Sequence, residues 1–103
     1  MNEDYFEKLG QILDHLEKRF PNGNDPFQAI TRLCEEAGEL AREVNHFENS
    51  GIKKQKHGEP NKEAMANEIQ DVMRCALQVA RLYNIEAEVK KSIDKSIQKI
   101  ESA

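Results

Sequence analysis

The chain has 103 residues, 33% of them charged, and a formal net charge of -4 at pH 7. The length fits one domain over residues 1–103, and the acidic balance argues against a general binder of nucleic acid or anionic membranes. No stretch reaches the roughly 18 consecutive apolar residues of a membrane span, and the acidic amino terminus lacks the apolar core of a signal peptide. We therefore expect a cytoplasmic protein.

Apolar residues recur with helical spacing along the whole chain, which predicts an all-α fold without strands. The first helix is expected over about residues 2–20 and ends at Pro21-Asn22-Gly23-Asn24. Asp25 is a suitable N-cap for the second helix, and Pro26 suits its first turn. This second helix is predicted over about residues 26–48.

The second helix contains a pair of acidic residues, Glu36 and Glu39, spaced so that their side chains share one patch of the surface. On a helical wheel the pair borders the apolar stripe formed by Leu33, Leu40, Val44 and Phe47. Gly38 lies between the two acids, where a glycine costs up to about 1 kcal/mol relative to alanine. We expect close approach of another helix or a ligand at Gly38.

A polar segment over about residues 49–61 predicts a loop, and it carries Lys53, Lys54 and Lys56. A third helix is expected over about residues 62–83. The fourth helix, over about residues 86–101, has an apolar stripe formed by Val89, Ile93, Ile97 and Ile100.

The third helix repeats the acidic pair, with Glu68 and Asp71 beside a stripe formed by Met65, Val72, Ala76 and Val79. At an effective dielectric of about 20, two carboxylates so close repel each other by roughly 3 kcal/mol, and a second pair packed opposite would add to this conflict. A divalent cation relieves it, and carboxylates with bound water suit magnesium best. The two pairs therefore predict a site for hydrolysis or for handling phosphate.

Two further features concern burial. The third helix is apolar over an unusually wide arc that includes Met73, Leu77 and Leu82, more than one layer of four helices would bury. We therefore expect a homodimer or a dimer of dimers with this helix at its centre. Cys34 and Cys75 stand among apolar residues, which favours two buried free thiols.

Residues 33–46, with Glu36 and Glu39, and residues 67–72, with Glu68 and Asp71, resemble the MazG-like nucleoside triphosphate pyrophosphohydrolases of the small stand-alone bacterial type. This family belongs to the all-α NTP pyrophosphatase superfamily, which is marked by Glu-x-x-Glu, a spacer and Glu-x-x-Asp. The resemblance covers about residues 25–89. It implies a four-helix, MazG-like bundle completed by homo-oligomerisation.

The resemblance also implies a reaction, the hydrolysis of a canonical, deoxy or modified nucleoside triphosphate between its α and β phosphates. The four acids, Glu36, Glu39, Glu68 and Asp71, would bind magnesium, with manganese as a possible substitute. A carboxylate not fully engaged by the metal can accept a proton, which leaves Glu36 and Glu39 both open as the catalytic base. Glu35 is either a supporting residue of the site or a solvated side chain.

The resemblance further implies basic residues that contact the phosphates. Lys53, Lys54 and Lys56 are candidates on the loop, and Lys91 and Lys95 are candidates on the last helix. Ser96 stands near a position where the family carries a basic residue. Phe27 and Gln28 could contact a nucleobase, although Phe27 is first interpreted as a core or staple residue.

Two alternatives remain open. The chain could be a phosphoribosyl-ATP pyrophosphatase-like enzyme, which shares the superfamily and its acidic motifs. It could also be a non-catalytic helical module that binds metal or nucleotide without turnover. The nucleotide partner's base and sugar are not predicted by any local motif.

Overall fold

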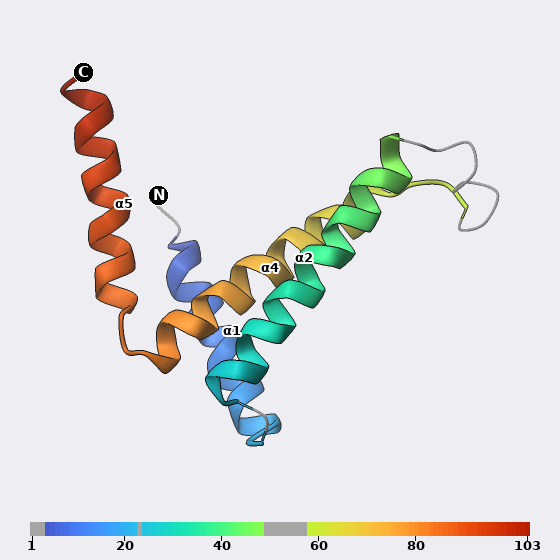
Figure 1. The fold of residues 1–103 in the computed structure, drawn as a ribbon, viewed down its shortest axis with the longest axis horizontal. Coiled ribbons are helices and arrows are strands. Elements are labelled where there is room, and N and C mark those ends of the chain that lie inside the picture. Colours follow the sequence, from blue (N-terminus) through green and yellow to red (C-terminus); the bar gives the residue numbers. More distant parts are fainter. Residues whose placement is uncertain (1–3, 23, 49–57) are drawn as a thin grey trace.

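The structure of the chain is a computed structural model that describes residues 4–22, 24–48 and 58–103. Its elements in chain order are α1 (Tyr5–Arg19), α2 (Pro26–Glu48), α4 (Lys62–Leu82) and α5 (Glu86–Glu101), shown in Figure 1. The described residues contain no strand, so the predicted all-α class is confirmed. Within these residues, no helix combines the length and apolar character needed to cross a membrane.

Side-chain caps fix where three of the helices begin. α1 starts at Tyr5, later than the expected residue 2, because Asp4 is extended and its carboxylate accepts a backbone N–H from the first turn at 3.1 Å. Asp25 caps α2 in the predicted way, at 2.8 Å. Asn61 caps α4 by accepting two backbone N–H groups, at 2.7 and 3.3 Å.

The longest helices, α2 and α4, lie side by side over most of their length (Figure 1). Ala29 of α2 and Cys75 of α4 are buried. At one end of the pair, His46 near the end of α2 makes a 2.8 Å hydrogen bond through Nε2 with the carbonyl oxygen of Gly58. This pair of helices carries both acidic motifs.

α4 also contacts α1 and α5. A small core of Leu13, Leu77 and Ala80 forms there, with Phe6, Leu9 and Val89 packed against it. Leu77 was one of the residues that widened the apolar arc of the third predicted helix. It is buried within the single chain, whereas Met73, on the same arc, is 50% exposed.

The turn from α4 to α5 is defined by backbone hydrogen bonds. Ile85 N–H donates to the carbonyl of Ala80 at 3.0 Å, and Asn84 N–H donates to that of Arg81 at 3.1 Å, which is a Schellman arrangement. Asn84 has a φ of 60°, a left-handed conformation that asparagine tolerates. α5 then diverges from the α2–α4 pair (Figure 1) and contains no buried residue.

Two local expectations are wrong, and a third, the close approach of a helix or a ligand at Gly38, finds no helix in the described structure. Phe27 is 81% exposed and is no core residue, because it lies about 200° around α2 from Ala29, the residue of this turn that is buried. Cys34 is free but exposed, so only Cys75 is a buried thiol. Gly38 has no atom of the described chain within 4 Å of the place where a Cβ would stand, so no helix of the described structure approaches it closely.

Candidate functional site

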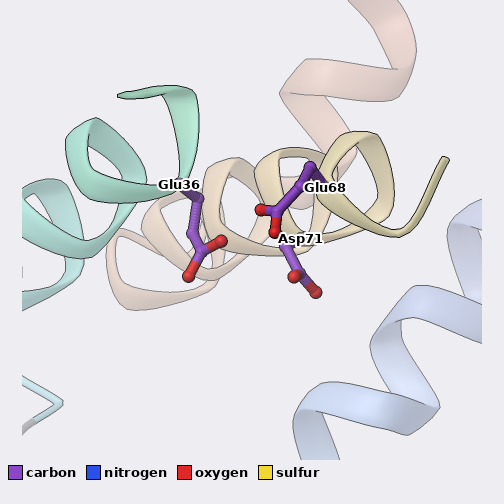
Figure 2. Close-up of side chains that lie close together, drawn as sticks. All are labelled: Glu36, Glu68 and Asp71. Atoms are coloured by element: carbon purple, nitrogen blue, oxygen red, sulfur yellow. The ribbon is translucent and has the colours of Figure 1, made fainter. Parts of the chain in front are cut away.

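The side chains of Glu36, Glu68 and Asp71 point toward a common space between α2 and α4 (Figure 2). One carboxylate oxygen from each residue lies within 4.8 Å of the others. All three side chains are partly buried. The structure thus brings together three of the four acids that the motifs predicted, and we call this group the carboxylate cluster.

The electrostatics of the cluster are unfavourable without a counterion. Partial burial raises the pKa of the Glu68 carboxyl, and its hydrogen bond with Glu36 raises it again. The negative charges of Glu36, Asp71 and Glu39 act in the same direction. In addition, Glu68 Oε2 is buried and has no hydrogen-bond partner among the described residues. A buried oxygen with no donor is the kind of group that a cation would satisfy.

Glu39 is outside this close group but belongs to the same electrostatic environment. Its carboxylate forms an ion pair with Arg42, one turn further along α2. Asp71 forms the corresponding pair with Arg74 on α4, at 3.3 Å. Each acidic helix therefore provides a guanidinium beside its second acid.

Sequence reasoning missed these two arginines, although a signal for them exists. Both motifs continue with the same spacing, as Glu36-x-x-Glu39-x-x-Arg42 and as Glu68-x-x-Asp71-x-x-Arg74. Residues three apart are neighbours on a helix, so each arginine falls beside the second acid of its motif. Extending the comparison of the two helices by one turn would have found both.

The other predicted residues have different outcomes. Lys53, Lys54 and Lys56 lie outside the described residues. Lys91 and Lys95 are exposed on α5, and that helix contacts α4 but not α2 in the described structure. No described contact joins either lysine to the carboxylate cluster, so their role as phosphate ligands stays a prediction.

Glu35 is exposed and lines a groove of about 460 Å³ together with Asp25, Phe27 and Gln28. The groove lies along the first turns of α2. The supporting role predicted for Glu35 is not tested by this arrangement and also stays a prediction.

Comparison with known proteins agrees with this geometry. No curated protein and no solved structure matches the chain significantly. The sequence profile of the MazG nucleotide pyrophosphohydrolase domain, however, matches residues 25–102, a segment that includes both acidic motifs and helices α2, α4 and α5. Because this match covers most of the chain, the protein belongs to the MazG nucleotide pyrophosphohydrolase family.

Proposed function

We propose that the protein is a magnesium-dependent enzyme that hydrolyses a nucleoside triphosphate between its α and β phosphates, releasing a monophosphate and pyrophosphate. The observation that carries this proposal is the convergence of Glu36, Glu68 and Asp71 from two helices on one space. Family membership supports a nucleotide pyrophosphohydrolase. The reaction, the metal and the triphosphate substrate are our inference from the site.

The residues present fit a divalent cation. All the donors are carboxylate oxygens, which hard cations such as magnesium prefer. The unpaired oxygen of Glu68 and the raised pKa of its carboxyl indicate a negative charge that the chain itself does not balance. Glu36, Glu68 and Asp71 would hold the ion, and when bound it would neutralise the phosphate oxygens and polarise the attacking water. Manganese has similar preferences and is expected to substitute.

The fourth acid suits a different role. Glu39 is held beside the cluster by Arg42, and it is not one of the three carboxylates that converge. Of the two candidates for the catalytic base, Glu39 is therefore favoured over Glu36, because a base must keep an oxygen available to accept the proton from water. Arg42 and Arg74 each lie beside the second acid of their motif and are candidates for binding the triphosphate oxygens, together with the predicted lysines.

We further propose that the chain acts as a homo-oligomer. α5 exposes Ile93, Ile97 and Ile100 at 52, 49 and 70%, and Met73 of α4 is exposed as well. A second copy of the chain would cover such surfaces. Light scattering on the purified protein measures the mass directly, and a monomer at micromolar concentration would contradict this part of the proposal.

The central experiment measures pyrophosphate release from canonical, deoxy and modified nucleoside triphosphates with magnesium, with manganese and with chelator. We expect metal-dependent release that falls about 100-fold or more in Glu36→Gln and in Glu39→Gln. The two variants should differ in metal affinity, which Glu36→Gln weakens and Glu39→Gln largely preserves. Glu63→Gln, an exposed acid on α4, is the matched control and should keep full activity.

Two results would contradict the proposal. Release that persists in chelator would exclude the carboxylate cluster as the reaction centre. Magnesium binding without release from any nucleotide in the panel would instead favour one of the alternatives, a non-catalytic binding module or an enzyme for an unusual nucleotide such as phosphoribosyl-ATP.

A further inference from the structure

A cavity of about 220 Å³ lies between α1, α2 and α4, next to the carboxylate cluster. Its wall on the side of α1 is formed by Leu13, Leu16, Glu17 and Phe20, three of them apolar. The opposite wall is polar and is formed by Asn24, Arg32, Arg74 and Gln78. The cavity is smaller than the about 300–1,000 Å³ that is usual for a whole small ligand, so it suits one part of a ligand, such as a single heterocycle.

Arg74 connects the cavity with the carboxylate cluster. Arg74 lines the cavity and also donates to Asp71 Oδ1 at 3.3 Å. Arg32 lies one turn before Glu36 on α2, and Gln78 lies about 10 Å beyond Asp71 along the axis of α4. Both residues lie on the same side of the cluster along the helix pair, so a nucleotide with its phosphates at the cluster can extend its sugar and base toward this cavity.

Gln78 is a polar residue that is only 5% exposed. Its Nε2 donates to Asn24 Oδ1 at 3.1 Å, which uses one end of the glutamine amide. No described residue donates a hydrogen bond to the other end, Oε1. Oε1 is not one of the fully enclosed unpaired side-chain atoms of the described chain, so it stays accessible to a donor from a ligand in the cavity.

The orientation of the Gln78 amide follows from its neighbours. Asn24 Nδ2 donates to the carbonyl oxygen of Phe20 at 3.0 Å, and Arg32 Nη2 lies 3.5 Å from Asn24 Oδ1. A backbone carbonyl only accepts and a guanidinium only donates, so the Asn24 amide has one possible orientation. Gln78 must therefore direct its nitrogen at Asn24 and leave its oxygen as the available acceptor.

We propose that this cavity binds the nucleobase of the substrate and that Gln78 Oε1 accepts a hydrogen bond from a ring N–H or an exocyclic amine of that base. The inference rests on the proposed function, since it assigns the base end of the same nucleotide. Leu16 and Phe20 offer apolar surface to a flat heterocycle, and Gln78 accepts a hydrogen bond from the edge of that heterocycle. Gln78 is then a residue that determines specificity among bases.

The test compares kcat/KM across the ribo- and deoxynucleoside triphosphates for the native protein, for Gln78→Met and for Gln98→Met. Methionine keeps the length of glutamine but removes the acceptor. We expect kcat/KM for the preferred nucleotide to fall about 10- to 100-fold in Gln78→Met, mainly through KM, with the preference among bases reduced. Gln98 is exposed on α5, and its variant should match the native protein.

A native enzyme that is active, together with a Gln78→Met variant that keeps the full preference among bases, would overturn the inference. Stabilisation of Gln78→Met by magnesium should equal that of the native protein, because the variant leaves the carboxylate cluster unchanged. A change in that stabilisation would show that Gln78 acts through the metal site, which also overturns the inference.

A second measurement uses the native protein alone, so it does not depend on turnover or on the folding of a variant. Nucleoside monophosphates are added with magnesium, and the side-chain amide signal of Gln78 is followed by NMR, with ribose 5-phosphate as the ligand without a base. We expect the signal to shift with the monophosphates and not with ribose 5-phosphate, while the Gln98 signal is unchanged. No shift, or the same shift with ribose 5-phosphate, would overturn the inference even if pyrophosphate release has failed.

Discussion

The α2–α4 pair and helix α5 distribute their charged and apolar side chains in opposite ways. Between α2 and α4, the carboxylates of Glu36, Glu68 and Asp71 are partly buried and close together. On α5 the situation is reversed, because the isoleucines are exposed and no residue is buried. The α2–α4 pair therefore partly buries charged groups, whereas α5 exposes apolar groups to water.

Both arrangements cost free energy in an isolated chain, but different partners relieve them. Close carboxylates are stabilised by a cation, whereas exposed apolar surface is stabilised by other apolar surface. We propose that a metal ion relieves the first cost and that a second copy of the chain relieves the second. The two proposals can be tested independently.

The largest expected effect concerns the carboxylate cluster. Magnesium at about 100 times its dissociation constant should stabilise the native protein by about 2.7 kcal/mol, or roughly 10–20 °C in melting temperature for a domain of this size. Glu68→Gln should remove most of this gain while melting higher than the native protein in chelator, since it relieves the crowding of charge. Thermal melts with magnesium and with chelator measure both changes.

The pH dependence of stability tests the same prediction, because the direction of the change with pH follows from the raised pKa of Glu68. The pKa of Glu68 in the folded protein is above its ordinary value of 4.5, so protonated Glu68 favours the folded state at low pH. That stability is lost as the pH rises through the folded pKa. In chelator, the advantage of Glu68→Gln over the native protein should therefore grow from acidic to neutral pH. A variant that melts lower than the native protein at neutral pH would contradict this account of the cluster.

A smaller effect is expected where α1, α4 and α5 meet. Arg81 donates to the carbonyl of Gly10 at 3.1 Å, forms an ion pair with Asp14, and lies 3.9 Å from Glu17 and 4.0 Å from Glu86. Arg81→Met leaves these groups without their cation and should destabilise the fold by about 1–3 kcal/mol, measured by chemical denaturation. Magnesium affinity should not change, which separates this region from the cluster.

Arg19→Met, at the exposed end of α1, is the control for that experiment and should be nearly neutral. If Arg81→Met weakened magnesium binding as much as stability, the two regions would not be independent, and the comparison between them would fail.

The pattern of the sequence predicted the helices because it is local. Asp25 and Pro26 mark the start of α2 through interactions within four residues, and helical periodicity needs no knowledge of tertiary structure. The sequence pattern could not predict that Leu77 packs against α1 while Met73 on the same arc stays exposed. That difference depends on the angle between helices, which no single helix encodes.

The same limit applies to the site. The two motifs identified the carboxylates, because an acid-x-x-acid pair is visible within one helix. Asn24 and Gln78 were missed, since their hydrogen bond joins residues far apart in the sequence. Glu39 was grouped with the other three acids, and only the packing of α2 on α4 shows that it lies outside the close group.

The smallest expected effect concerns Gly38, on the acidic helix itself. Because no described atom lies within 4 Å of its missing Cβ, Gly38→Ala should stabilise α2 by about 0.5–1 kcal/mol. Gly10→Ala on α1, where the space is also open, is the matched comparison and should behave alike. If Gly38→Ala alone lowers both the melting temperature and the mass measured by light scattering, a second copy packs closely at Gly38.

Every close approach between described helices involves α4, which contacts α2, α1 and α5 while these three make no such contact with one another. α1 and α2 precede α4 in the chain, so both are synthesised before their common partner. In proteins, most of the stability of a helix comes from the packing of its amphipathic face. We therefore expect the first half of the chain to gain its tertiary structure only when α4 is available.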